Sequence, residues 1–340
     1  MIVDAHAHII VRAAAAGSSG PAGSVDSAGS DSWRPRVVEE AGRSRIYTDG
    51  RELTSIVREF TDPGRMAEEA AAQGVGHLLL SPWVRLLPFG RPLPEARQIC
   101  KIQNDALSDL VAADPGRFSA LGAVPLQDPV TAARDLRTLR AAGLAGVELT
   151  PEIAGRYLGD DAFGPFWEAA EDTGAVIFIH PATRGLALPV FGDYYLWNSV
   201  ANPVETAIAA AHLVMAGVLE RHPALKILLA HAGGALWAVR GRLRRAHAQV
   251  PAAGARLRES PDESLARLYH DTVTHDQALL RRLIEDAGPE HVLLGSDRPF
   301  DMGSDDPVGE VRALGLSAAA EAAVLGGNAI RLLGRTDAAP

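Results

Sequence analysis

Five residues that bind metal ions well directly follow short apolar runs in this sequence. His6 and His8 follow the first run and are two residues apart, so both side chains leave the same side of an extended segment. His180, His231 and Asp297 end three other apolar runs. Neutral imidazoles combined with one carboxylate suit Zn²⁺ or a similar divalent ion, with room for a bound water. We therefore expect a metal site built from His6, His8, His180 and Asp297.

The elements that must position these residues alternate along the chain. Continuous apolar runs are typical of strands buried on both faces. Eight such runs occur, at residues 2–3, 75–80, 118–124, 144–149, 176–179, 226–230, 268–273 and 292–294. Segments with helical spacing lie between them, for example at 94–113, 130–142, 163–172, 204–219 and 277–286. The pattern predicts a (β/α)₈ barrel, with a doubly wound open sheet as the alternative, and a barrel places its active site where the strands end.

One stretch departs from this alternation. We interpret the chain as a single barrel domain over residues 1–340, with an insertion at 9–60. Residues 13–32 are almost entirely Ala, Gly, Ser, Pro and Asp, which predicts a flexible loop. A turn signal at 48–50, within residues 36–53, predicts a small hairpin. The loop follows the first strand, so it is either a tolerated surface insertion or a lid over the substrate.

Composition excludes several classes of protein. The 42 acidic residues outnumber the 33 basic ones and give a formal net charge of −9, which argues against nucleic acid or an anionic membrane as the main partner. Cys100 is the only cysteine, so there is no internal disulfide or thiolate metal cluster. The longest apolar stretch, at 207–219, is too short to span a membrane. Since the first residues also lack the pattern of a signal peptide, we expect a cytoplasmic protein.

Four motifs occur in a specific order. They are Asp-x-His-x-His at 4–8, His-Pro at 180–181, His-x-Gly-Gly at 231–234 and Leu-Gly-Ser-Asp-x-Pro-Phe at 294–300. Together with residues 66–75, 124–128 and 202–206, they resemble the amidohydrolase superfamily. Within it they resemble the amidohydrolase-2 branch, typified by 2-amino-3-carboxymuconate 6-semialdehyde decarboxylase. The resemblance covers essentially the whole chain.

The resemblance implies a role for each of the chemically capable residues. It makes the four expected ligands, His6, His8, His180 and Asp297, hold a single Zn²⁺, with Mn²⁺ as the alternative. It makes His231 the general acid/base beside a metal-bound water. The fourth strand ends without the lysine of the binuclear members of the superfamily. A bridging carbamylated lysine therefore looks absent.

The resemblance also implies how a substrate is held. Arg51 and Arg242 match two arginines that bind substrate carboxylates, and Arg242 would reach into the site of a neighbouring subunit, which implies a homodimer. His275 and Trp197 follow the seventh and fifth strands, where they could contact substrate or simply pack. Arg298 stands where the decarboxylase has a tyrosine, so substrate detail is expected to differ.

Two kinds of chemistry fit such a site. In the first, protonation of the carbon that bears a carboxylate turns CO₂ into a leaving group, with the arginines holding the anion. In the second, a metal-activated water attacks an ester, lactone or amide, and Asp297 or His231 carries the proton to the leaving group. A hydratase is a related third reading, and a non-catalytic metal-binding role a fourth. We favour non-oxidative decarboxylation of an unsaturated or aromatic carboxylic acid, because the resemblance is closest there.

Overall fold

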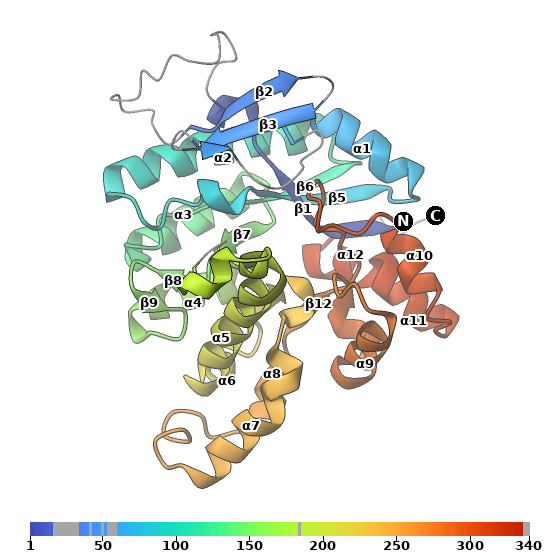
Figure 1. Cartoon of the computed structure of the whole chain (residues 1–340). Coiled ribbons are helices and arrows are strands. Elements are labelled where there is room, and N and C mark those ends of the chain that lie inside the picture. The colour runs from blue at the N-terminus through green and yellow to red at the C-terminus, as the bar shows by residue number, and fades with distance from the viewer. Residues whose placement is uncertain (16–33, 41–42, 49–50, 53–59, 183–184, 336–340) are drawn as a thin grey trace.

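The computed structural model describes residues 1–15, 34–40, 43–48, 51–52, 60–182 and 185–335. Eight parallel strands form one sheet, in the order β1-β5-β6-β7-β10-β11-β12-β13 (Figure 1). Their bounds are Val3–Ile9, His77–Pro82, Phe118–Gly122, Gly146–Leu149, Val176–Ile179, Lys226–Leu229, Tyr269–Asp271 and Val292–Leu293, in the same order. The sheet closes on itself, because Ala5 donates from its backbone N–H to the carbonyl of Leu294 at 2.8 Å and Asp297 donates to that of His6 at 2.9 Å. The predicted (β/α)₈ barrel is confirmed.

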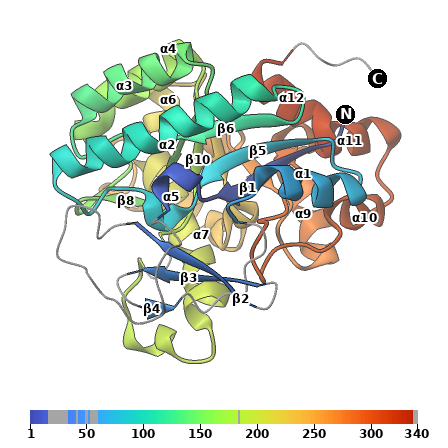
Figure 2. The same ribbon diagram turned by 90° about the horizontal axis from the view of Figure 1, so that it is seen from above.

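Helices surround the strands (Figure 2). They are α1 (Pro63–Ala72), α2 (Leu93–Ala113), α3 (Pro129–Ala141), α4 (Gly164–Thr173), α5 (Asn202–Met215), α6 (Val218–Arg221), α7 (Leu236–Gln249), α8 (Pro261–Leu265), α9 (Gln277–Ala287), α10 (Pro307–Arg312), α11 (Ala318–Ala322) and α12 (Asn328–Leu333). Several begin at an aspartate whose carboxylate accepts the backbone N–H three residues later, as Asp62, Asp128 and Asp276 do. Gly174 ends α4 at φ 58°, a left-handed conformation that glycine adopts without strain.

The barrel interior and its outer layer are packed separately. One apolar cluster contains Val3, Leu79, Leu121, Phe178 and Leu228, all fully or almost fully buried, together with residues of α12. A larger cluster joins the outer faces of the strands to the surrounding helices. Phe178 lies directly beneath the strand ends, with its ring 4.9 Å from the ring of His6. The tightly packed interior therefore holds the side chains at the mouth of the barrel in place from below.

Some boundaries differ from the sequence-based expectations. β1 runs from Val3 to Ile9, so His6 and His8 lie within the strand rather than after it. The single helix expected at 204–219 is divided into α5 and α6. Gly217 separates them at φ 69°, in close contact with the backbone of a later loop. Glycine suits this position because its φ is left-handed and a Cβ there would overlap with the carbonyl oxygen of Arg256.

Three short strands that lie between β1 and α1 in the sequence form a second, antiparallel sheet. It consists of β2 (Arg36–Glu40), β3 (Arg43–Thr48) and β4 (Arg51–Glu52), and β2 and β3 lie at one end of the molecule in Figure 1. The loop expected at 13–32 begins differently, since Arg12–Ala14 form a 3₁₀ turn in which Ala14 is buried. Residues 16–33, which make up the rest of that loop, lie outside the described residues.

Within the part of the chain that the structure describes, no helix combines the length and the apolar character needed to cross a bilayer.

Candidate metal centre and active site

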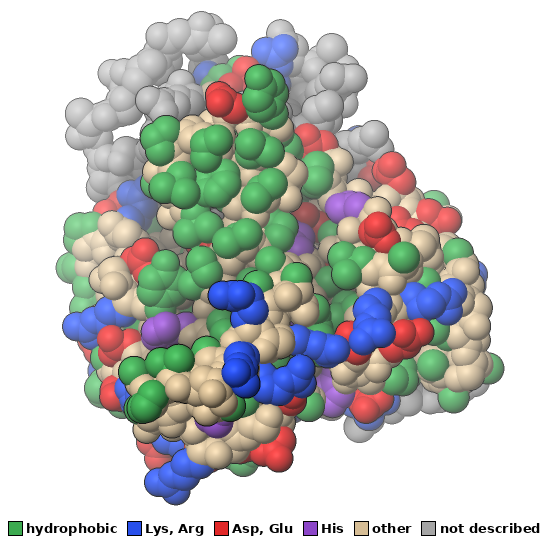
Figure 3. Space-filling model, turned by 60° about the horizontal axis from the view of Figure 1, so that its bottom comes forward, with side chains coloured by type: hydrophobic (Ala, Val, Ile, Leu, Met, Phe, Trp, Pro, Cys, Tyr) green, Lys and Arg blue, Asp and Glu red, His purple; other side chains and the backbone are tan. Residues whose placement is uncertain are grey.

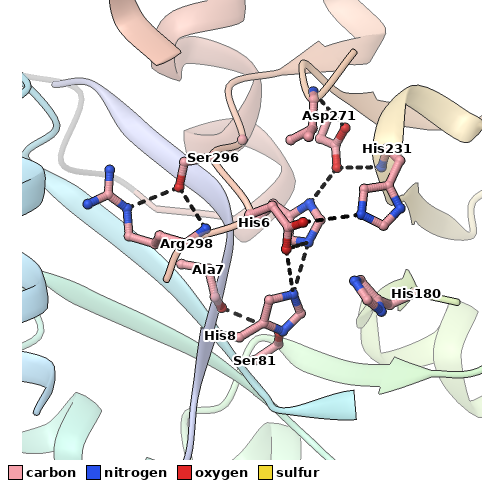
Figure 4. Close-up of polar contacts among 12 residues, drawn as sticks. His6, Ala7, His8, Ser81, His180, His231, Asp271, Ser296 and Arg298 are labelled. Atoms are coloured by element: carbon pink, nitrogen blue, oxygen red, sulfur yellow. Dashed lines mark hydrogen bonds and ion pairs between the residues drawn. The ribbon is translucent and has the colours of Figure 1, made fainter. Parts of the chain in front are cut away.

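His6 and His8 converge because alternate residues of β1 face the inside of the barrel. Both are fully buried, and their Nε2 atoms lie 3.0 Å apart (Figure 4). His6 donates from Nδ1 to Asp271 Oδ2 at 2.6 Å, and His8 donates from Nδ1 to Ser81 Oγ at 3.0 Å. With these acceptors at Nδ1, each ring can turn the lone pair of Nε2 toward a cation placed between the two rings. Two lone pairs at 3.0 Å repel each other unless positive charge lies between them.

Three more side chains reach the same point from other strands. Asp297 Oδ1 lies 3.2 Å from His6 Nε2 and 3.4 Å from His8 Nε2. His231 Nε2 lies 3.4 Å from Asp297 Oδ2. The ring of His180 lies 4.7 Å from that of His8 and 5.1 Å from that of His231. All five residues that the sequence analysis singled out at strand ends therefore gather at one end of the barrel. Figure 4 shows the four histidines together there.

These groups have the donor set and the unpaired atoms of a metal site. Ligand atoms of His6, His180, His231 and Asp297 all lie within 4.8 Å of one another. His180 donates from Nδ1 to the carbonyl of Pro181 at 2.9 Å, which leaves its buried Nε2 with no hydrogen-bond partner among the described residues. Asp297 Oδ1 is likewise buried without one. Histidine ligands usually donate their second nitrogen in this way, so the residues present fit a divalent cation.

The charges at the centre favour a bound cation. Burial, and the neighbouring imidazoles, lower the pKa of His180 well below its ordinary value, and burial lowers that of His8, so both rings are neutral as ligands must be. Burial opposes ionisation of Asp297, but His6 and His231 hold the pKa of this carboxyl well below its usual range. At His6 burial acts to lower the pKa, yet Asp297 and Asp271 raise it to about 10. The two carboxylates thus stabilise positive charge at this point.

The turn after β11 aims His231 into the barrel mouth. His231 and Ala232 have φ values of 54° and 60°, and Gly233 and Gly234 have 80° and 59°. Residues other than glycine rarely adopt this left-handed backbone conformation, and such strain is typical of residues held in place for function. Asp297, with φ 57°, is held in the same way. Both residues are thus fixed in position by the surrounding structure rather than by local preference.

A cavity of about 200 Å³ opens beside the centre. His231 and Asp297 line its inner end, and His275 lies on its wall, as the sequence analysis proposed for a substrate contact. The other lining residues are Asn198, Ser199, Pro203, Ala232, Gly234, Val273, Thr274, Leu279 and Met302. Trp197 is not among them; its buried ring instead packs edge-on against Tyr195 at 4.8 Å. The cavity is smaller than the pockets of roughly 300–1,000 Å³ that hold drug-sized ligands, so it suits a compact molecule.

The two arginines expected to bind substrate carboxylates are placed differently. Arg242 lies on α7 with an exposed side chain, outside the cavity. Arg51 belongs to β4, and its side chain is not among those described. Arg298 does not face the cavity but donates from Nε to Asp4 Oδ2 at 3.1 Å and from a terminal nitrogen to Gln73 Oε1 at 2.5 Å. No Lys or Arg side chain lines the cavity among the described residues.

Two buried carboxyl groups next to the centre were missed from the sequence. Asp271 ends β12 and accepts from His6; the only signal was a carboxylate at the end of the seventh strand. Glu148 on β7 lies in the fourth strand of the barrel, where the sequence analysis noted only that a lysine is absent. It is fully buried, with neither carboxyl oxygen hydrogen-bonded among the described residues, and Oε1 lies 3.9 Å from His180 Nδ1. Burial raises the pKa of Glu148 well above its ordinary value, which favours the neutral acid.

Together the fold and the site define a (β/α)₈ metalloenzyme whose centre lies where the strands end, beside a small cavity. The family model for amidohydrolases matches residues 3–335, and the chain belongs to this family. A 2-amino-3-carboxymuconate-6-semialdehyde decarboxylase from Dictyostelium discoideum is 28% identical over 86% of this chain and 82% of its own length.

Solved structures agree with this assignment. A 5-carboxyvanillate decarboxylase from Sphingomonas paucimobilis superposes with a TM-score of 0.79 and 25% identity, over 98% of this chain and 99% of the other. A 5-carboxyvanillate decarboxylase from Novosphingobium aromaticivorans, solved with manganese, gives a TM-score of 0.74 at 25% identity, over 81% of each chain. The predicted family is confirmed, and so is the predicted class of enzyme, a metal-dependent carboxy-lyase.

Proposed function

We propose that this metal-dependent decarboxylase acts on a small unsaturated or aromatic carboxylic acid and releases CO₂ without oxidation. The observation that carries the proposal is the cluster of three buried imidazoles, one carboxylate and His231 at the inner end of a compact cavity. The relatives named above are decarboxylases of carboxylated muconate and vanillate compounds, which supports this substrate class. No feature of the described residues favours the hydrolase or hydratase alternative.

We assign metal binding to His6, His8, His180 and Asp297, and proton transfer to His231. His6 and His8 have side chains that are 0% exposed, whereas that of His231 is 16% exposed and lines the cavity. His231 is thus the imidazole best placed to meet a substrate. Three imidazoles and a carboxylate suit Zn²⁺, our choice for the native ion, and Mn²⁺ is the alternative because structural neighbours hold it. A cation held there would act as a Lewis acid and as a template for the carboxylate.

The residues of the chain account for the proton transfers. We assign the transferred proton to Nε2 of His231, which lies 3.4 Å from Asp297 Oδ2. His231 delivers this proton to the substrate carbon that bears the carboxylate. The bond from that carbon to the carboxylate then breaks, its electron pair restores the conjugation of the substrate, and CO₂ leaves. His231 regains a proton from solvent through the open cavity. Polar wall residues such as Asn198, Thr274 and His275 bind the other substituents.

We infer a homodimer in which Arg242 of one copy completes the cavity of the other. α7 projects from the barrel (Figure 1), and only Leu236 of its residues is buried. Arg240 and Arg244 form ion pairs with Asp286 and Asp262. Arg242 forms none with the described residues and stays exposed. Basic side chains gather across the face that Figure 3 brings forward. Since no arginine among the described residues lines the cavity, Arg242 of a second copy is an available donor.

One experiment tests the decarboxylase proposal. Purified protein is analysed for metal and then incubated with a panel of aromatic and unsaturated carboxylic acids, while CO₂ release is measured. We expect close to one divalent ion per chain and CO₂ release from at least one acid. Acid formation from esters, lactones or amides without CO₂ would instead establish the hydrolase, and protein without bound metal would exclude both.

A complementation experiment tests the dimer. In the proposed dimer, each site takes His231 from one copy and Arg242 from the other. The variants Arg242→Ala and His231→Ala therefore each remove a different one of these two contributions. A mixed dimer therefore contains one intact site, and random mixing restores about a quarter of the wild-type activity. Recovery of no activity on mixing, with a monomer in sedimentation, would contradict the shared site.

A further inference from the structure

The carboxylate of Asp271 accepts hydrogen bonds from a proposed metal ligand, His6, and from the proposed proton-transfer residue, His231. Asp271 is fully buried at the end of β12. Its Oδ2 accepts from His6 Nδ1 at 2.6 Å and from the backbone N–H of His231 at 2.9 Å (Figure 4). Its Oδ1 accepts from the backbone N–H groups of Ala232 at 2.7 Å and Val273 at 3.0 Å. All four partners are donors, so the carboxylate is satisfied only as an anion that accepts from each of them.

The backbone that Asp271 holds cannot take this form without support. His231 and Ala232 are consecutive residues with left-handed φ values, and their backbone N–H groups both turn toward one point, a concave site for an anion. The carboxylate of Asp271 fills that site. Each of these non-glycine residues carries a conformational cost, which persists only where the surroundings fix it. The two backbone hydrogen bonds to Asp271 supply that constraint.

The same carboxylate decides which nitrogen of His6 faces the metal position. An acceptor at Nδ1 holds the proton there and leaves the Nε2 lone pair free toward His8 and Asp297. A donor placed at Nδ1 would reverse this, because the ring would then carry its proton on Nε2. A protonated Nε2 cannot bind a metal ion.

We propose that Asp271 is a positioning residue that couples the metal ligand His6 to the proton-transfer residue His231, by fixing the tautomer of one and the turn of the other. The proposal rests on the function assigned above to these two histidines. Asp271 touches neither substrate nor metal, and acts only through the groups it accepts from.

The variant Asp271→Asn tests both halves, because its side-chain amide has the same shape but replaces one acceptor oxygen with a donor. If the amide NH₂ of the variant side chain faces Nδ1 of His6, the ring must carry its proton on Nε2. If the NH₂ faces the turn instead, it lies against the backbone N–H groups of His231 and Ala232, so two donors face each other. We expect Zn²⁺ affinity, measured by competition with a chelating dye, to fall about 10- to 100-fold. At saturating Zn²⁺ we expect kcat to stay reduced while KM changes little, because the turn that carries His231 is loosened.

Asp276→Asn is the matched control. It lies five residues further along, is exposed, and caps α9 by accepting from the N–H of Leu279 at 2.8 Å. Asparagine caps helices as well as aspartate does, so this variant should keep wild-type metal affinity and turnover. If Asp271→Asn binds Zn²⁺ as tightly as wild type, or regains full kcat once saturated, the coupling is refuted.

A measurement on the unaltered protein protects the test against a variant that fails to fold. In Zn²⁺-loaded protein labelled with ¹⁵N-histidine, His6 should show a protonated, slowly exchanging Nδ1–H and an unprotonated Nε2. An unprotonated Nδ1 at His6 would overturn the proposal. Wild-type protein that binds Zn²⁺ but releases CO₂ from no acid would refute the proposed function alone, because the affinity ratio and the tautomer would still decide the role of Asp271.

Discussion

The buried acid Glu205 allows a quantitative test of how burial changes the pKa of a carboxyl group close to the site. It lies in the first turn of α5, is 4% exposed, and accepts from the backbone N–H of Ala182 at 3.1 Å, two residues after His180. Burial, together with the nearby charge of Glu152, raises its pKa from 4.5 to about 7, although the Ala182 hydrogen bond acts against this. The perturbation we choose is Glu205→Gln, which imitates the neutral acid and keeps an oxygen for Ala182.

The sign and size follow from linkage. Because the native pKa exceeds the unfolded one, the native state keeps the proton over a range in which the unfolded state has lost it. Glu205 therefore lowers the free energy of unfolding as pH rises from 4.5 to 7, and its effect is constant above 7. Between pH 5 and pH 8 the loss amounts to about 2.5 kcal/mol. Glutamine does not titrate, so the variant should gain this amount relative to wild type over the same interval.

Guanidinium denaturation at pH 5, 6, 7 and 8, with metal removed from all samples, measures the difference between the two proteins. Other titrating groups cancel in the subtraction. Glu168→Gln, an exposed glutamate on α4, is the control and should show a difference that is independent of pH. A difference between Glu205→Gln and wild type that stays constant from pH 5 to pH 8 would refute the argument that burial holds this acid neutral.

Three further outcomes are expected. His231→Ala should keep its metal, measured by elemental analysis, yet release CO₂ about 10²- to 10⁴-fold more slowly, and full activity would remove the proton-transfer role. Removing the metal with a chelator should abolish CO₂ release and lower the melting temperature, and both should recover with Zn²⁺ or Mn²⁺; an unchanged melting temperature would argue against a metal held by the native state. Gly146→Ala should lower stability by about 3 kcal/mol or more, because a Cβ there would overlap with the carbonyl of Val176, and a near-native melting curve would contradict this packing.

The strand-end pattern predicted much of the fold and the centre because both depend on periodicity. Parallel strands end at one rim, so polar residues that terminate apolar runs must meet there, and His6, His180, His231 and Asp297 do. His8 joins them because a spacing of two on a strand keeps one face.

The sequence does not predict which polar side chains form hydrogen bonds with each other across the barrel. Nothing in the spacing says that Asp271 accepts from His6 while Asp4 ties Ser296 and Arg298 to β1, since both are simply aspartates on barrel strands. Nor does composition show that the pKa of Glu148 is raised, because this shift depends on burial that only packing creates. The left-handed turn after β11 is equally hidden, since it needs Asp271, 40 residues later, to hold it.

The division between strands and loops also indicates where substrate choice resides. The proposed ligands stand on or directly after the rigid strands, whereas Asn198 and Met302 line the cavity from two connections that follow β10 and β13. Tyr195 joins these connections by donating from its hydroxyl to Asp301 Oδ1 at 3.3 Å. The relatives named above are decarboxylases of different carbon frameworks, a muconate semialdehyde and a vanillate, and this chain is similar to both. A centre that can serve both frameworks cannot select between them, so we infer that the selection lies in the contacts made by these two connections.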